Sequence, residues 1–350
     1  MPTIDADAHV IETPKTWSYM RENEQDLRPQ IFVRDVNDGA PLRTNSRREF
    51  WFLEGQVLSK GSNVGKDVPP ESGTMEDIDR RLAHMDETGV DVQVLFPSLF
   101  LRPLTQERDT DFALARSYNR WMAEIWKKSP QRLRWVLVPP LLSLADKGLI
   151  REELAFCKEN GACGIFLRGV ECERLISHRH FFPLYEIAQE LDLAITLHAG
   201  VNSVPYHDMF LPSSSLITFK FPVIGAFNGL LEDEIPSRFP GLRWGFIEAS
   251  AQWVPYVLGE ARIRLRTKGK RISDSLMSDN RFYVTTQHTD DLPGLLNEVG
   301  DDNFVIGTDY GHKDTATEVM AIKRLSGDGS IPKSSSEKIL EINPRKLYAI

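Results

Sequence analysis

The feature that most constrains the fold is an eightfold alternation of short apolar runs with helical patterns. Each run has the length and apolar or β-branched content of a buried strand. The eight predicted strands are Thr3–His9, Val90–Pro97, Arg134–Pro139, Gly164–Arg168, Ala194–His198, Arg243–Glu248, Arg281–Thr286 and Asn303–Asp309. Largely apolar strands that alternate with helices predict a parallel sheet covered on both faces. Eight such units favour a (β/α)8 TIM barrel over an open sheet, although seven or nine strands stay open as alternatives because the runs are short.

Two stretches are too long to be simple connections between a strand and a helix. The first, residues 19–72, is polar and interrupted by glycines and a proline pair, and we predict an insertion that lies over the barrel mouth. The second, Gly200–Ser215, follows the fifth strand. Capping boxes at Thr74–Asp77 and Thr315–Glu318 predict helix starts. No linker or internal repeat is evident, so residues 1–350 are expected to form one domain.

Composition narrows the function classes. The chain has 42 Lys and Arg against 50 Asp and Glu, a net charge of −8, which argues against a general binder of nucleic acid or of anionic membranes. No apolar run approaches the roughly 18 residues of a membrane span. The three cysteines show no C-x-x-C spacing, and the N-terminus has no signal-peptide pattern. These features predict a reduced, cytoplasmic compartment.

Acids and histidines fall at the C-terminal ends of the predicted strands, where TIM barrels carry their active sites. Asp7 and His9 are two residues apart and therefore share one face of the first strand. The full set is Asp7, His9, His198, Glu248 and Asp309, with His312 three residues further on. Side chains that follow apolar runs are partly buried and need partners, and one shared divalent ion would satisfy them together. Separate hydrogen bonds are the competing interpretation, but they do not explain the common location.

Four other residues are weighed as weaker candidates. Arg168 ends the fourth strand, where it could bind a substrate carboxylate or form a structural ion pair. His288 follows the seventh strand and is a candidate for substrate contact at the mouth. Glu12 is a further candidate ligand, although an acid in its position is more often solvated. His84 lies on a charged helix and is expected at the surface.

Four segments resemble the motifs of one known family, in the same order. Ile4–His9 is similar to a first-strand metal motif, with Asp7 where a histidine or acid stands, and Leu197–Gly200 is similar to a strand-five histidine motif. Arg238–Arg243 is similar to the sequence R-F-P-x-L-R that leads into strand six. Gly307–His312 is similar to G-[ST]-D-Y-P-H, with Gly311 replacing the proline. The family is the amidohydrolase superfamily, in the branch that includes aminocarboxymuconate-semialdehyde and γ-resorcylate decarboxylases. The resemblance covers nearly the whole chain.

This resemblance implies a divalent ion (Zn, Mn or Fe) bound by Asp7, His9, His198 and Asp309. One departure matters, because the decarboxylases carry a histidine after strand six where this chain has Glu248. The departure leaves hydrolysis and decarboxylation both open. Glu248 and His312 would also enlarge the set to one that could hold a second ion, as in dinuclear oxygenases.

Three function classes follow. The first is hydrolysis or non-oxidative decarboxylation of a small carboxylated or amidated molecule, with Asp309, Glu248 and His312 as catalytic groups. The second is an O₂-activating hydroxylase with two Fe ions or one Mn and one Fe. The third is a non-catalytic partner subunit of the same fold. The resemblance also implies a homodimer or higher oligomer, with a paralogous subunit as an alternative partner.

Overall fold

A computed structural model describes residues 2–36, 46–61, 64–203, 205, 216–270 and 273–350. Eight parallel strands form one sheet with the order β1-β5-β6-β7-β10-β11-β12-β13. They are β1 Ile4–Val10, β5 Val92–Pro97, β6 Leu133–Leu137, β7 Ala162–Arg168, β10 Ala194–His198, β11 Trp244–Ile247, β12 Phe282–Thr286 and β13 Phe304–Ile306. Each strand lies within a few residues of its predicted position. The TIM-barrel prediction is therefore confirmed.

The first and last strands close the barrel through backbone hydrogen bonds. The N–H groups of Thr308 and Asp309 donate to the carbonyl oxygen of Asp7 at 3.1 and 2.9 Å, and His9 N–H donates to the carbonyl oxygen of Tyr310 at 2.8 Å. The Asp5 carboxylate reinforces this seam, because it accepts from the N–H and the hydroxyl of Thr308 at 2.9 and 2.6 Å. The closure brings Asp7 and Asp309 to neighbouring positions.

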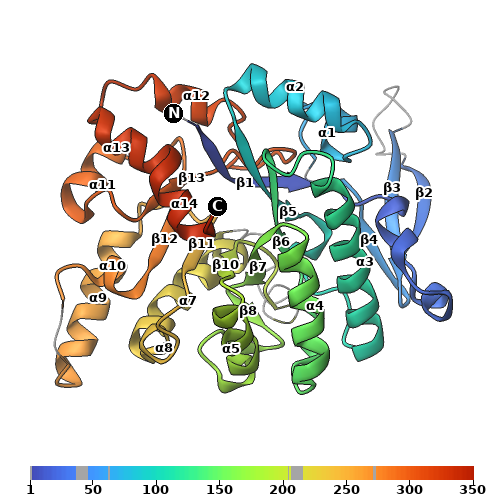
Figure 1. Ribbon diagram of the computed structural model, residues 1–350, viewed down its shortest axis with the longest axis horizontal. Helices are drawn as coiled ribbons and strands as arrows, with labels where there is room; N and C mark the ends of the chain where they lie inside the picture. The colour runs from blue at the N-terminus through green and yellow to red at the C-terminus, as the bar shows by residue number, and fades with distance from the viewer. Residues whose placement is uncertain (1, 37–45, 62–63, 204, 206–215, 271–272) are drawn as a thin grey trace.

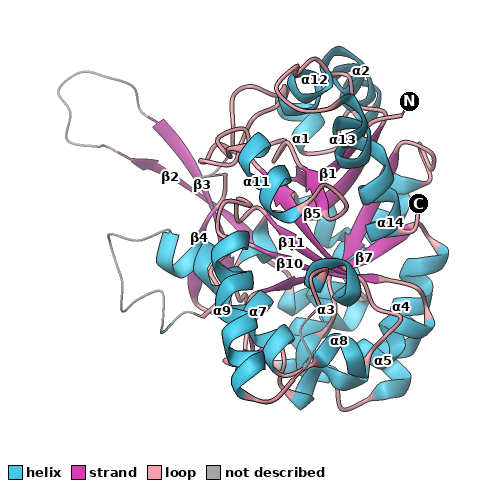
Figure 2. Cartoon of the chain, turned by 90° about the vertical axis from the view of Figure 1, so that its left-hand side faces the viewer, coloured by secondary structure: helices cyan, strands magenta, loops and turns pink. Residues whose placement is uncertain are grey.

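Helices surround the barrel on its outside (Figures 1 and 2). The α-helices are α1 Pro70–Gly73, α2 Ile78–Thr88, α3 Arg108–Trp126, α4 Lys147–Glu159, α5 Phe182–Glu190, α7 Phe221–Glu232, α8 Ile235–Arg238, α9 Val254–Thr267, α10 Leu276–Asn280, α11 Leu292–Val299, α12 Ala321–Ser326, α13 Lys333–Glu337 and α14 Asn343–Tyr348. Short 3₁₀ turns are η1 Pro14–Tyr19, η2 Glu22–Leu27, η3 Leu99–Leu101, η4 Leu141–Ser143 and η5 Arg179–Phe181, and π-helical turns are η6 Leu216–Lys220 and η7 Lys338–Ile342. No helix in the described ranges is long and apolar enough to cross a membrane.

Both predicted capping boxes are wrong in detail. The side chain that caps α2 is Asp77, whose Oδ1 accepts from Arg80 N–H at 2.8 Å. Thr74 instead ends α1. Thr315–Glu318 opens no helix, because α12 begins only at Ala321.

The segment after β1 contains a three-stranded antiparallel sheet, β2 Gln30–Val36, β3 Ser46–Leu53 and β4 Gln56–Ser59. Trp51 of β3 and Leu58 of β4 are paired across the two strands, and both are buried. Beyond β4, Val64 forms a β-bridge with His312, and Gly65 N–H donates to the Gly311 carbonyl at 2.9 Å. This segment therefore reaches the loop after β13. That residues 19–72 as a whole cover the mouth stays a prediction.

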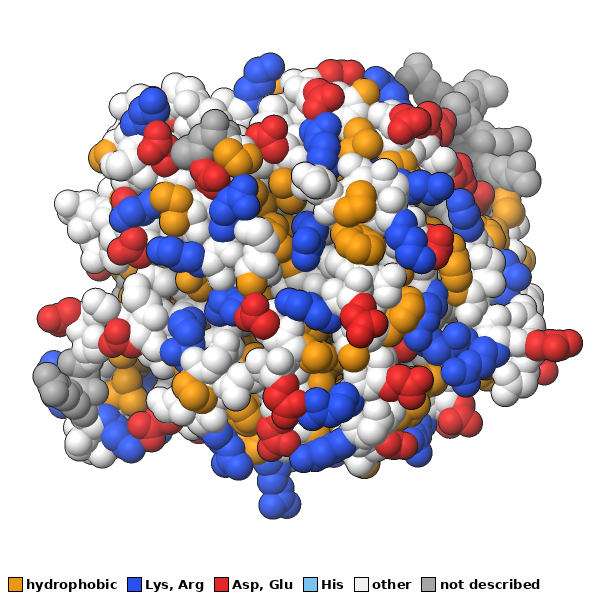
Figure 3. All heavy atoms as spheres, viewed as in Figure 1, with side chains coloured by type: hydrophobic (Ala, Val, Ile, Leu, Met, Phe, Trp, Pro, Cys, Tyr) orange, Lys and Arg blue, Asp and Glu red, His pale blue; other side chains and the backbone are white. Residues whose placement is uncertain are grey.

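Two further surface features complete the fold. A small antiparallel pair, β8 Val170–Glu171 and β9 Arg174–Leu175, follows β7. Most of the predicted second long loop, Gly200–Ser215, lies outside the described residues. On the face drawn in Figure 3, acidic and basic side chains are interspersed rather than segregated by sign.

Candidate functional site

The predicted ligands converge at the C-terminal ends of the barrel strands. β1 presents Asp7 and His9, and the last residue of β10 is His198. Glu248 directly follows β11, and Asp309 lies in the loop after β13. All five residues are at most 2% exposed. They therefore need partners within the protein or a bound ion.

Asp7, His9 and His198 form the tightest group. His9 Nε2 lies 3.2 Å from His198 Nε2, and His198 Nε2 lies 3.2 Å from Asp7 Oδ1. The third side of the triangle, from His9 Nε2 to Asp7 Oδ1, is 3.5 Å. Ligand atoms about 2.0–2.1 Å from a tetrahedral ion are separated by roughly 3.3–3.4 Å. The triangle has the size of one face of such a coordination shell.

The tautomers of the two histidines support the same conclusion. His9 Nδ1 lies 3.0 Å from the Pro97 carbonyl oxygen, and His198 Nδ1 lies 2.7 Å from that of Ala199. A carbonyl only accepts, so both Nδ1 atoms carry hydrogen and each Nε2 is the ring atom left to bind a cation. Against the effect of burial, the Asp7 carboxylate beside Nε2 raises the pKa of His198, and a cation bound there would replace the proton. Burial, with the neighbouring His312 and His198, holds the pKa of His9 well below its usual value, so its ring is neutral. Two imidazole Nε2 atoms and a carboxylate oxygen are a donor set that fits a divalent cation.

Asp309 and His312 form a second group with His9. Asp309 Oδ1 lies 3.4 Å from His9 Nε2 and 2.8 Å from His312 Nδ1. Asp309 Oδ2 accepts from the Thr317 hydroxyl at 2.6 Å. The His312 ring stacks on His9 with 3.9 Å between centroids, and its Nε2 lies 2.8 Å from Ser98 Oγ. Asp309 thus lies beside the first group, and each of its carboxylate oxygens is oriented by a hydrogen bond, one with His312 and one with Thr317.

Glu248 belongs to a third group, with Asp309 and Asp314. Glu248 Oε2 lies 3.3 Å from His198 Nδ1, but neither Glu248 oxygen accepts a well-aligned hydrogen bond from a residue in the described part of the chain. Burial, together with the Asp309 and Asp314 carboxylates, raises the pKa of Glu248 well above its usual value. The structure groups His312 with His9 rather than with Glu248, contrary to the expected pairing. Asp314 was not singled out from the sequence, although its place five residues after Asp309 in one loop was a usable signal.

Local backbone geometry at these positions is unusual. Glu248 and Asp309 have positive φ angles of 62° and 50°, a region that non-glycine residues rarely adopt and that clusters at functional sites. Close approach is also required at Gly307, where an added Cβ would lie 2.3 Å from Asp7 Cβ. A side chain at Gly307 would therefore displace a candidate ligand.

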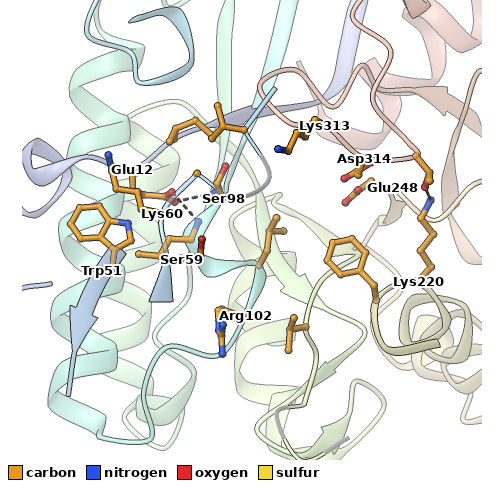
Figure 4. Close-up of a pocket in the computed structure, with 18 of the residues that line it drawn as sticks. Glu12, Trp51, Ser59, Lys60, Ser98, Arg102, Lys220, Glu248, Lys313 and Asp314 are labelled. Carbon is orange, nitrogen blue, oxygen red and sulfur yellow. Dashed lines mark hydrogen bonds between the residues drawn. The ribbon is translucent and has the colours of Figure 1, made fainter. Parts of the chain in front are cut away.

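A cavity of about 810 Å³ opens above these groups; we call it the main cavity. Its lining side chains come from the loops after β1, β5, β10, β11 and β13 and from the β2–β4 segment (Figure 4). They are Ile11, Glu12, Trp51, Ser59, Lys60, Gly61, Val64, Ser98, Leu99, Leu101, Arg102, Val201, Leu216, Phe219, Lys220, Glu248, Lys313, Asp314 and Thr315. Glu248 and Asp314 thus connect the buried groups to the space that a substrate could enter.

Of two residues expected in solvent, Glu12 is buried and His84 is half-buried. Glu12 is 2% exposed and accepts from the N–H groups of Ser98 and Leu99 at 3.0 and 2.9 Å. Burial raises the pKa of Glu12 to about 7. His84 is half-buried, with Nδ1 2.8 Å from the Tyr310 hydroxyl. Glu12 lines the main cavity but belongs to none of the three ligand groups.

The structure brings neither Arg168 nor His288 to the main cavity. Arg168 forms a buried ion pair with Glu171 and donates to the Phe100 carbonyl at 3.2 Å, which is the structural alternative. It lines a separate hollow of about 340 Å³. His288 is exposed and outside the residues that line the main cavity.

Comparison with known proteins gives consistent similarities. The family model described as amidohydrolase matches residues 4–350. A γ-resorcylate decarboxylase of Polaromonas sp. (strain JS666 / ATCC BAA-500) is 26% identical over 276 residues, 72% of this chain and 82% of the relative. An amidohydrolase structure from Mycobacterium avium subsp. paratuberculosis K-10 has a TM-score of 0.79 at 16% identity, covering 99% of each chain. A dihydroxybenzoic acid decarboxylase structure from Polaromonas sp. JS666, with bound manganese and the inhibitor 2-nitroresorcinol, has a TM-score of 0.66 at 18% identity, covering 99% of this chain and 97% of that one.

Proposed function

The chain belongs to the amidohydrolase family, and we propose that it is a metal-dependent enzyme that hydrolyses or non-oxidatively decarboxylates a small carboxylated or amidated molecule. The observation that carries the proposal is the triangle of donor atoms from Asp7, His9 and His198, with Asp309 beside it. The manganese in a decarboxylase of similar fold supports a divalent ion here.

In this proposal Asp7, His9, His198 and Asp309 hold the ion. A bound divalent ion polarises a substrate oxygen or lowers the pKa of a water molecule. The chain's own contribution is positioning and proton transfer. The carbonyl oxygens of Pro97 and Ala199 fix the two histidine tautomers. The Thr317 hydroxyl and His312 Nδ1 orient the two oxygens of Asp309.

Asp309 serves as the acid and base in either reaction. In hydrolysis its carboxylate takes a proton from water as the water oxygen bonds to the substrate carbonyl carbon, and the proton then goes to the leaving nitrogen or oxygen. In decarboxylation the bond to the carboxyl carbon breaks, CO₂ leaves, and the electron pair stays on the other carbon. Protonated Asp309 delivers its proton to that carbon and regains one from water. The named activities of the relatives favour decarboxylation, whereas the glutamate after strand six departs from the decarboxylase pattern.

The test uses metal-loaded protein with a panel of hydroxybenzoates and of aryl and acyl amides. Released CO₂ identifies decarboxylation, and a new carboxylate with free amine identifies hydrolysis. Asp309→Asn should abolish either signal, whereas Asp301→Asn, an acid bonded to Ser335 and Lys338, should keep it. Release of neither product by metal-loaded wild-type protein, or an active Asp309→Asn variant, would count against the proposal.

A second candidate function, O₂ activation at two ions, is favoured by one observation. The buried Glu248 carboxylate lies with those of Asp309 and Asp314, and its 3.3 Å contact with His198 Nδ1 does not balance three negative charges, so a second cation would compensate all three. Elemental analysis should then give two metals per chain, and Glu248→Gln should reduce the number to one. A single ion at full occupancy, with Glu248 more than ~4 Å from any metal density, would reject this candidate.

A further inference from the structure

The wall of the main cavity carries four cationic side chains, and they differ in how they are paired. They are Lys60, Arg102, Lys220 and Lys313, the first three of which have partners in the protein. Lys60 Nζ lies 2.5 Å from Glu49 Oε2, and Lys220 Nζ lies 3.2 Å from Thr315 Oγ1. Lys313 forms no hydrogen bond or ion pair with any residue in the described ranges.

Lys313 is placed to meet a ligand. It directly follows His312 and enters the main cavity from the loop after β13, beside Asp314 and Glu248 (Figure 4). It also lines an adjoining hollow of about 590 Å³. One alternative is that Lys313 only balances the nearby acids. However, Lys313 is exposed and forms no ion pair with either acid among the residues that the structure describes. An unpaired cation in a concave wall attracts an anionic group.

The rest of the wall is suited to an apolar body. Its apolar members are Ile11, Trp51, Val64, Leu99, Leu101, Val201, Leu216 and Phe219. Trp51 is held in place by edge-to-face packing on Trp17, with 6.0 Å between ring centroids. The cavity, at about 810 Å³, is several times the roughly 150 Å³ that holds a single benzene molecule. The space therefore fits a body larger than one aromatic ring.

We propose that the substrate is an apolar molecule of two fused rings or comparable size that carries an oxyanion, and that Lys313 binds this oxyanion. The inference rests on the proposed function for the location of the site, but not on the choice between hydrolysis and decarboxylation. It makes Lys313 a specificity-determining residue, since an uncharged analogue of the same shape would lose only the ammonium contact.

The experiment measures binding of 2-naphthoate and of the uncharged 2-naphthamide by isothermal titration to Mn²⁺-loaded protein. Lys313→Met should weaken naphthoate binding by roughly tenfold, the scale of one partly solvated charge pair. The same variant should leave naphthamide binding within about twofold, because the apolar wall is intact. Lys313→Arg should restore naphthoate binding. Lys66→Met is the matched control, since Lys66 is exposed just beyond Gly65 and outside the lining.

Three results would overturn the inference. They are unchanged naphthoate binding in Lys313→Met, equal loss of both probes in that variant, and no naphthoate binding to wild-type protein at millimolar concentration. Metal content is measured on every sample, and the titrations are repeated without metal. Failure to take up metal would reject the proposed function, whereas the naphthoate and naphthamide comparison in metal-free protein still tests Lys313 alone.

Discussion

Asp7→Asn should remove most of the stabilisation that metal gives to the protein. Asp7 Oδ1 lies 3.2 Å from His198 Nε2 and 3.5 Å from His9 Nε2, so its carboxylate is the anionic corner of the donor triangle. Asparagine keeps the shape but replaces the charge with a neutral amide. In metal-free protein the change relieves repulsion among the buried carboxylates but also removes the contact between Asp7 and His198. The shift in Tm on adding metal, rather than the Tm of metal-free protein, therefore tests the role of Asp7.

The size of the effect follows from linkage. Metal at 100 times its dissociation constant stabilises the folded state by about 2.7 kcal/mol. A chain of 350 residues has an unfolding entropy of roughly 0.7 kcal/mol/K, so the wild-type Tm should rise by about 4 °C. Loss of a group that only orients a ligand costs 10–100-fold in metal affinity, so loss of a ligand should cost at least about 100-fold. At the same metal concentration the variant then gains only about 0.4 kcal/mol, less than 1 °C.

The assay is thermal unfolding followed by circular dichroism across a Mn²⁺ titration. Asp5→Asn is the matched control, because Asp5 lies on the same strand but accepts from Thr308 and Gln93 and belongs to no ligand group. It should lower the Tm of metal-free protein and keep the full metal shift. An unchanged metal shift in Asp7→Asn would refute the reasoning, as would equal losses in the two variants.

Four other outcomes are expected. Asp309→Asn should leave the fold intact and reduce turnover by roughly 10²-fold or more in steady-state kinetics once a substrate is found, the scale of losing an acid/base group; near-normal turnover would contradict its role. Gly307→Ala, whose Cβ would press on Asp7 Cβ at 2.3 Å, should cost about 1–3 kcal/mol in urea unfolding and weaken metal binding, and a neutral result would contradict the close approach. Burial raises the pKa of Asp111 from 3.8 to about 7, so the folded state retains a proton that the unfolded state loses. The free energy of unfolding should therefore fall as pH rises from 4 to 7. Asp111→Asn should flatten that fall in urea titrations, and an unaltered dependence of stability on pH would exclude Asp111 as its source. We expect a dimer in solution with the exposed face of the β2–β4 sheet in contact, so Phe52→Asp should shift the mass measured by light scattering toward the monomer; a wild-type monomer would contradict this.

The barrel could be predicted from the sequence because its strands are buried on both faces and read as continuous apolar runs. The ligands could be predicted for the same reason, since Asp7, His198 and Asp309 interrupt or end such runs. In a TIM barrel, a residue at the C-terminal end of any strand lies at the same end of the barrel, so its place in the sequence predicts its place in space. Confirmation of the strands therefore placed the acids and histidines at one end of the barrel.

The errors lie in loops, where contacts link residues far apart in the sequence. Glu12 looked solvated, but its carboxylate is held by backbone N–H groups more than 80 residues away. The capping pattern at Thr315–Glu318 failed because the Thr315 hydroxyl accepts from Lys220 Nζ rather than from a helix N-terminus. Asp314, in the same loop, follows no apolar run, so only the folded chain brings it to Glu248.

A crystal structure of metal-replete protein, with anomalous data at the edge of the metal found by elemental analysis, tests the central claim most directly. The account predicts an anomalous peak about 2.0–2.2 Å from Asp7 Oδ1, His9 Nε2 and His198 Nε2, with Asp309 beside it. Metal-replete protein with no anomalous peak within ~4 Å of those three atoms would contradict it.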